Sequence, residues 1–188
     1  MLRNSVVIID RGYYEELVKE VENLLKEYGE LRELSIKEWL YSQDPASVDI
    51  SIIKRGFEFV RSEVEFLKEQ ILEKPVDEVK NSPILSRVLE RSYQLIVEAL
   101  ADIARHITSS MGWGPCFTAS ECFKRIAEKN VIPEQLVEEL IKRMKVRNII
   151  IHRYLDVDYE ELYKDTHKLI SLTHEFEEHI VKFLRNLK

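Results

Sequence analysis

A long amphipathic stretch in the middle of the chain covers residues 81–115 and reads NSPILSRVLERSYQLIVEALADIARHITSSMGWGP. Its start, Asn81-Ser82-Pro83, places a capping residue before a proline at the first helical position. Apolar residues then recur every three or four positions, at Leu85, Val88, Leu89, Ile96, Leu100, Ile103 and Ile107. This spacing predicts one long helix, which ends in the run of serine, glycine and proline before residue 116.

Apolar residues repeat with the same period on both sides of that stretch. They predict further helices over residues 14–31, 53–71, 118–127, 133–154, and from Asp156 or Asp158 to residue 187. Residues 6–9 alone resemble a strand, and we treat them as an anchored tail. We therefore expect an all-α fold, an antiparallel helical bundle of four to five main helices. Residues 1–45 are expected to form an amino-terminal helical extension and residues 46–188 the bundle domain.

The composition excludes several classes of protein. Among 188 residues, 45% are hydrophobic and 33% are charged, which is too apolar for an intrinsically disordered chain. No segment approaches the roughly 18 uninterrupted apolar residues of a membrane helix, so we expect a cytoplasmic protein with no membrane partner. Cys116 and Cys122 have no cysteine or histidine neighbours at zinc-ligand spacing, which excludes a disulfide framework or a zinc finger.

One window of the sequence is basic although the net charge is -6. Residues 141–155 contain no carboxylate and five cations, Lys142, Arg143, Lys145, Arg147 and Arg153. Such a window can hold a phosphate group of a nucleic acid. The alternative is that these side chains complement the negative end of a helix that closes near Tyr154. Charge alone does not decide between the two interpretations.

The same window reads Arg147-Asn148-Ile149-Ile150-Ile151-His152-Arg153-Tyr154. Metal-free cleavage of RNA needs a base for the 2′-hydroxyl proton, a cation for the phosphorane charge and an acid for the leaving oxygen. His152 can transfer protons and Arg147 can hold a phosphate. Five positions on a regular helix separate the two side chains by about 140°. A helix irregularity or a second copy of the motif across a dimer axis would bring the two together, and the second arrangement points to a homodimer.

This R-N-x3-H-x-Y element, followed at once by Leu155-Asp156-Val157-Asp158, resembles the HEPN superfamily, specifically its HepT-like branch encoded beside minimal nucleotidyltransferases. In that branch a long helix similar to residues 86–104 precedes a loop and a short segment like residues 122–128. Ile132-Pro133 follows in the same order. The resemblance covers about residues 50–188, and the first forty-five residues lie outside it.

The resemblance implies a metal-independent endoribonuclease, the toxin of a toxin-antitoxin pair, which acts as a homodimer with two motifs facing one cleft. By position, Arg147 and His152 correspond to the catalytic pair and Asn148 to the polar residue beside the arginine. Tyr154 resembles the tyrosine that the cognate minimal nucleotidyltransferase, the antitoxin, modifies with AMP. No cofactor is implied. Further candidates to bind the phosphates of an RNA substrate are Arg143, Lys145 and Arg153.

Two alternatives remain open. The chain could be a non-catalytic helical subunit that binds nucleotide or nucleic acid in a nucleotidyltransferase complex, with Arg147 as a phosphate contact and His152 structural. It could also be a purely structural bundle in which residues 149–151 make the segment a core helix.

Other residues could carry chemistry but favour plainer roles. Asp102 and His106 are four positions apart and could form a catalytic dyad, although a surface pair is the commoner arrangement. Glu98 and Asp102 could steer Arg147 or lie on an ordinary exposed face. Trp113 could stack on a base or, as we favour, close one end of the bundle. We propose no metal site, because helical zinc spacing is absent among His167, His174 and His179.

Overall fold

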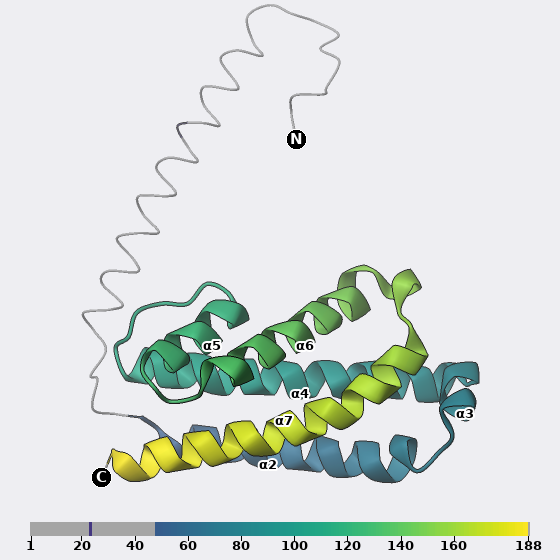
Figure 1. Cartoon of the computed structure of the whole chain (residues 1–188), viewed down its shortest axis with the longest axis horizontal. Coiled ribbons are helices and arrows are strands. Elements are labelled where there is room, and N and C mark those ends of the chain that lie inside the picture. The colour runs from purple at the N-terminus through teal and green to yellow at the C-terminus, as the bar shows by residue number, and fades with distance from the viewer. Residues whose placement is uncertain (1–22, 24–47, 188) are drawn as a thin grey trace, which may run out of the picture. The chain divides into compact units, whose positions relative to one another are not determined.

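The computed structural model of the chain describes residue 23 and residues 48–187. The described part contains helices and no strand, so the all-α prediction is confirmed there (Figure 1). Its elements are α2 (Ile50–Leu67), the π-helical turn η2 (Lys68–Leu72), α3 (Val76–Asn81), α4 (Pro83–Ser110), α5 (Ala119–Glu128), α6 (Glu134–His152), the 3-10 turn η3 (Tyr154–Asp156) and α7 (Tyr159–Asn186).

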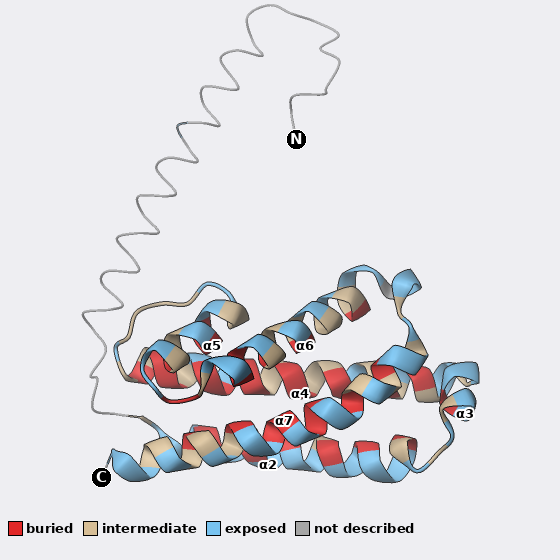
Figure 2. Cartoon of the chain, viewed as in Figure 1, coloured by how far each residue is buried: buried red, intermediate tan, exposed pale blue. Residues whose placement is uncertain are grey.

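Helix α4 is the centre of the bundle. It contacts α2, α3, α5, α6 and α7, and its buried stripe runs along almost its whole length (Figure 2). The start of α4 is the predicted one, because the Ser82 hydroxyl accepts a hydrogen bond from the Leu85 amide at 3.4 Å and Pro83 occupies the first turn. The completely buried hydrophobic residues of α4 are Leu89, Tyr93, Ile96, Leu100, Ala104 and Ile107.

The long helices are antiparallel to their neighbours in sequence. Helices α2 and α6 run in one direction along the bundle, and α4 and α7 return in the other (Figure 1). An aromatic cluster joins three of the elements, since the ring of Phe176 in α7 lies 6.1 Å from that of Phe57 in α2 and 6.1 Å from that of Phe123 in α5. This packing holds α7 against the bundle, and α7 in turn supports α6.

Polar side chains begin the shorter elements as the sequence indicates. The Thr118 hydroxyl accepts a hydrogen bond from the Glu121 amide at 3.2 Å at the start of α5. Asn130, two residues after α5, adopts a positive φ of 56°, a conformation that asparagine tolerates better than most residues. Of the two aspartates considered for the start of α7, Asp158 is the cap, because its carboxylate accepts from the amides of Glu160 and Glu161.

The cysteines differ from the expectation. Cys116 and Cys122 are joined by a disulfide bond. A single bond is no disulfide framework, but the sequence spacing did not predict the bond. The loop after α4 returns Cys116 to the first turns of α5, where the two Cα atoms lie 5.3 Å apart, a separation that a disulfide requires.

Several predictions concern residues outside the described part. They are the helix over residues 14–31, the tail at residues 6–9, and the boundary between an extension over residues 1–45 and the bundle domain. These stay predictions. Among the described residues, no helix is long and apolar enough to cross a membrane.

Candidate active site

Helix α6 positions the motif. Its buried side chains Leu136, Val137, Leu140 and Ile150 face the core, and the motif occupies its last two turns before the helix ends at His152. The motif is therefore carried on a rigid element up to its histidine, and η3 follows directly.

The guanidinium of Arg147 turns toward α4, where it meets Glu98. Arg147 Nε donates to Glu98 Oε1 at 3.0 Å, and its Nη2 forms an ion pair with the same oxygen. Gln94, one turn earlier in α4, also donates to this oxygen at 3.0 Å. On the other side, Arg147 Nη1 donates to Asn148 Oδ1 at 3.2 Å. Of the two acidic residues considered as partners of Arg147, Glu98 contacts it, whereas Asp102 pairs with Arg105.

These contacts leave part of Arg147 available. A guanidinium has five N–H groups, and three of them donate to Glu98 and Asn148. The remaining two lie on the terminal nitrogens, and 24% of the side chain is exposed. An arginine held in this way presents a forked pair of donors that matches a phosphate.

Glu98 is charged in this arrangement. Burial disfavours its ionised form, but the hydrogen bonds from Arg147 and Gln94 outweigh burial, so that the pKa of the Glu98 carboxyl lies below its ordinary value. The carboxylate therefore stays paired with Arg147 near neutral pH.

His152 lies apart from this cluster. It is the exposed last residue of α6, and within the described part of the chain no hydrogen bond or ion pair joins it to Arg147. The helix continues without interruption from Arg147 to His152, so the divergence expected from five positions is kept. One chain therefore brings together Arg147, Asn148 and Glu98, and leaves the histidine facing solvent.

The structure argues against one predicted phosphate contact, that of Arg143. Its side chain is only 4% exposed and bridges Glu139 at 2.6 Å and Asp165 at 2.8 Å. The Asp165 carboxylate also accepts a hydrogen bond from the buried Tyr93 hydroxyl at 2.6 Å. Burial raises the pKa of Tyr93, so its hydroxyl remains a donor. Arg143 thus ties α6 to α7 and α4 and is not free to bind RNA.

The other predicted residues lie around the end of α6. Lys145 is exposed and, among the described residues, makes no ion pair. Arg153 is exposed and pairs with Asp156 at 2.7 Å. Tyr154 is the first residue of η3, two positions after His152.

Sequence reasoning missed the acidic partners of Arg143. Glu139 could have been found, because it lies four positions before Arg143 on the same helix. Asp165 and Tyr93 come from other helices, and no local pattern links them to Arg143. Asp102 and His106 form neither the dyad that was considered nor the surface pair that was favoured. Asp102 pairs with Arg105, and His106 Nε2 lies 3.5 Å from the Ser110 hydroxyl.

Trp113 closes one end of the bundle, which was the favoured interpretation. Its ring lies 5.9 Å from that of Phe183, and the Lys129 ammonium lies over it. No group of three metal-ligating side chains occurs among the residues that the structure describes.

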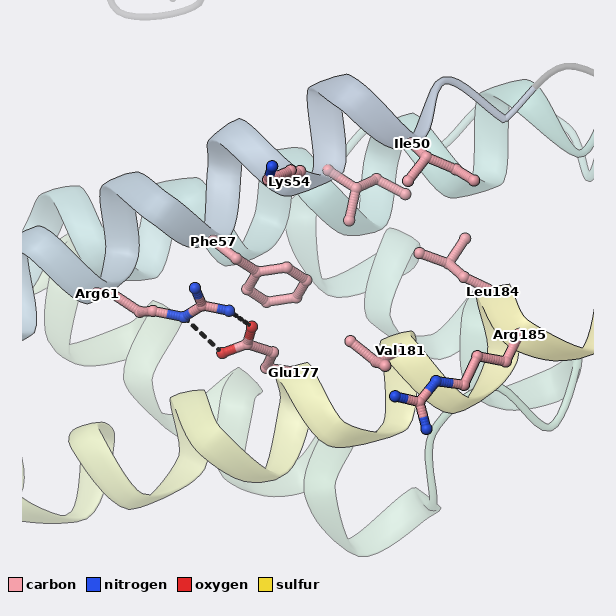
Figure 3. Close-up of a pocket in the computed structure, with 9 residues that line it drawn as sticks. Ile50, Lys54, Phe57, Arg61, Glu177, Val181, Leu184 and Arg185 are labelled. Atoms are coloured by element: carbon pink, nitrogen blue, oxygen red, sulfur yellow. Dashed lines mark hydrogen bonds and ion pairs between the residues drawn. The ribbon is translucent and has the colours of Figure 1, made fainter.

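Two cavities of comparable size flank α7. One, of about 350 Å³, lies between α6 and α7 next to η3. The other, of about 280 Å³, lies between the first turns of α2 and the last turns of α7 (Figure 3). Its walls are apolar, and Arg61 and Glu177 pair across one end. Of these two, only the first adjoins the motif. A more open hollow of about 530 Å³ lies between the end of α3 and residues 155–160.

The helices that carry these residues match a known protein family. Residues 60–180 match the model of the family described as Ribonuclease HepT-like. The chain belongs to this family. The match includes α4, α6 and most of α7, and therefore every contact of Arg147 described above.

This HepT-like chain is similar to a curated protein, the tRNA nuclease HepT of Aphanizomenon flos-aquae, with 29% identity over 76 residues. The match covers 40% of this chain and 52% of the relative, so the chain spans about half the length of the curated relative it matches.

Solved structures share the fold. A cytosolic protein of unknown function, YutE from Bacillus subtilis, aligns with a TM-score of 0.62 at 20% identity and covers 73% of this chain and 92% of its own. A tri-AMPylated HEPN toxin of Shewanella oneidensis, in complex with its MNT antitoxin, aligns with a TM-score of 0.59 at 22% identity. That alignment covers 69% of this chain and 93% of the toxin.

We expect Arg143→Met to destabilise the bundle by about 3 kcal/mol, because two carboxylates would lose their buried cation. Urea unfolding followed by circular dichroism measures this loss. The matched control is Lys145→Met on the exposed face of α6, which should change the free energy of unfolding by less than about 0.5 kcal/mol. Equal effects of the two substitutions would contradict the structural role of Arg143.

The Glu98 pair should make stability depend on pH. Because the folded-state pKa of Glu98 is lowered, its contribution is complete above the unfolded-state value of about 4.3 and is lost as the pH falls through the folded-state value. The melting temperature of the parent should therefore exceed that of Glu98→Gln at pH 7, and this difference should shrink at pH 3. Glu178→Gln, at an exposed position of α7, is the control. A difference that is independent of pH would contradict the pairing.

Proposed function

We propose that this chain is a metal-independent endoribonuclease, the toxin of a toxin-antitoxin pair, which acts as a homodimer. The observation that carries the proposal is the arrangement of Arg147. Glu98 and Asn148 fix its guanidinium while two N–H groups stay available for a phosphate, and a solvent-facing His152 ends the same helix.

The proposed chemistry assigns one task to each side chain. His152 takes the proton of the 2′-hydroxyl, which attacks the adjacent phosphorus, and a protonated histidine returns a proton to the leaving 5′ oxygen. Arg147 stabilises the negative charge that develops on the non-bridging oxygens. Asn148 holds Arg147 from the side opposite Glu98. None of these steps requires a metal ion.

The dimer follows from the divergence of Arg147 and His152 along α6. A second copy that brings its own α6 alongside would place the histidine of one chain near the arginine of the other. Apolar surface is available for this contact beside the motif, since Leu155 is 86% exposed and Ile151 is partly exposed. Exposed leucine at the end of a functional helix favours association with another protein surface.

The relatives suggest the substrate and the partner. The similar curated protein is named a tRNA nuclease, so we propose RNA as the substrate class and transfer RNA as the first substrate to assay. The HEPN toxin of similar fold is described as tri-AMPylated and in complex with an MNT antitoxin. We propose that a cognate minimal nucleotidyltransferase binds this chain and transfers AMP to Tyr154.

In the proposed transfer, the phenol oxygen of Tyr154 forms a bond to the α-phosphorus of ATP. The bond from that phosphorus to the bridging oxygen breaks, pyrophosphate leaves, and the phenol proton passes to solvent. The new phosphodiester carries a negative charge into the basic end of α6, where exposed Lys145 and Arg153 lie near in sequence. A charge there competes with the RNA phosphate for Arg147.

We expect a dimer in light scattering at micromolar concentration. Leu155→Asp should shift the mass to that of a monomer and lower cleavage together with dimerisation, because a charge would be buried in the contact. Ile84→Asp is the matched control at a leucine-sized side chain that is 74% exposed on α4. A parent chain that is monomeric and fully active would contradict the composite site.

His152→Ala should lower the cleavage rate on the order of a hundredfold or more, since general acid–base help is lost. EDTA should not change the cleavage rate of the parent. Arg147→Lys should also cleave RNA slowly, because lysine lacks the forked donors of a guanidinium. His174→Ala, an exposed histidine of α7, should cleave like the parent. If the His152→Ala chain cuts RNA as fast as the parent, the non-catalytic binding subunit becomes the better interpretation.

Incubation with the cognate nucleotidyltransferase, ATP and magnesium should add the mass of AMP to Tyr154 and stop cleavage. Tyr154→Phe should keep nuclease activity but escape silencing, because it has no hydroxyl to modify. Intact-mass and peptide mass spectrometry detect and locate the AMP, and the cleavage assay measures the silencing. Modification found only at Tyr159 or Tyr163, or a Tyr154→Phe chain that is still silenced, would remove Tyr154 from the mechanism.

A further inference from the structure

The cavity between α6 and α7 adjoins the end of the motif. Its volume of about 350 Å³ lies within the range of small-molecule sites. Three elements contribute its apolar wall, through Val146 and Ile149 of α6, Val157 of the connection after η3, and Leu162 of α7. These aliphatic side chains can enclose a flat ring.

The charged groups around this cavity indicate which chemistry fits inside. Two lysines, Lys164 and Lys168, and four carboxylates line the cavity. The carboxylates are those of Asp156, Asp158, Glu161 and Asp165. Asp165 and Asp156 are paired with Arg143 and Arg153, so these charges largely balance, and the cavity offers no cluster of free cations to a phosphate or to the backbone of an RNA. Such a setting suits an uncharged group that carries hydrogen-bond donors.

Most of these charged groups already form ion pairs or hydrogen bonds within the chain. Asp165 accepts from Arg143 and Tyr93, Asp156 pairs with Arg153, Asp158 caps α7, and Lys164 pairs with Glu160. Among the described charged residues that line the cavity, Glu161 and Lys168 make no side-chain hydrogen bond or ion pair. One carboxylate acceptor, Glu161, and one ammonium donor, Lys168, are therefore available in the lining of the cavity.

The cavity also lies close to the proposed modification site along the backbone. Tyr154 and Asp156 are the first and last residues of η3, and Asp156 lines the cavity. Consecutive Cα atoms are 3.8 Å apart, so the Cα atoms of these two residues are separated by at most about 7.6 Å. A tyrosine side chain extended by a phosphodiester is longer than this separation.

We infer that the cavity receives the adenine and ribose of an AMP group attached to Tyr154, while its phosphate stays outside. The inference rests on the proposed function, because it assumes transfer of AMP to this tyrosine. The aliphatic wall packs on the adenine ring, and Glu161 accepts hydrogen bonds from the ribose hydroxyls or the exocyclic amine. The nucleoside then anchors the connection between the motif helix and α7.

A first experiment tests the cavity without the modification. Adenosine is titrated into the full chain and followed by amide chemical shifts, with inorganic phosphate as the control solute. We expect shifts confined to residues 146–168 and a dissociation constant on the order of 1 mM. Val157→Trp, which fills the cavity, should abolish them, and Glu161→Gln should weaken binding at least about fivefold. Ile84→Trp and Glu178→Gln, at exposed positions outside the cavity, should bind like the parent.

A second experiment uses the chain modified at Tyr154. Hydrogen exchange at residues 156–162 should slow at least about tenfold on modification of the parent and stay unchanged on modification of Val157→Trp. Equal exchange before and after modification of the parent overturns the inference and leaves the proposed function intact.

The two proposals fail in different ways. If no AMP is found on Tyr154, the proposed silencing fails, and binding of free adenosine alone decides whether the cavity is a nucleoside site. If adenosine shifts no residue of the cavity at about 10 mM and modification brings no protection, the inference is wrong. A change of oligomeric state in Val157→Trp, with no adenosine binding to the parent, would instead assign the cavity to an interface between proteins.

Discussion

The ion cluster around Arg143 determines where the motif lies. Arg143 is buried and joins Glu139 of its own helix to Asp165 of α7, which in turn accepts from Tyr93 of α4. Burying an arginine without these partners would cost free energy of folding. Helix α6 therefore has one favourable rotation about its axis and one favourable position along it, relative to α4 and α7. Arg147 lies one helical turn further along the same face and therefore meets α4 at Glu98.

The same rotation of α6 explains why His152 does not lie beside the Arg147 guanidinium of its own chain. Nine positions separate Arg143 from His152, which is about half a turn beyond two full turns, so the histidine emerges on the side opposite the anchored face. The arginine is rigid and partly covered, while the histidine is free and exposed. Under the proposed function, two copies related by a twofold axis would be the simplest arrangement that returns an imidazole to each guanidinium.

The local signals of the sequence predicted most of the described fold. Helix period, the cap at Ser82 and the capping threonine at Thr118 act within a few residues, and each formed as expected. The motif was found because its residue types stand close together in the chain. What could not be predicted depends on contacts between helices. The partners of Arg143 come from α7 and α4, and the Cys116–Cys122 bond depends on the path of a loop that no periodic pattern describes.

The charges on the two sides of η3 explain why an adenylyl group suits this position. Toward the end of α6, Lys145 and the remaining donors of Arg147 attract an anion. Toward α7, the cavity has aliphatic walls and offers the Glu161 carboxylate as an acceptor for hydrogen-bond donors. A phosphate alone would satisfy only the first environment and a nucleoside alone only the second. AMP carries one group of each kind, joined by a short bond, so a single modification between the two environments can complement both.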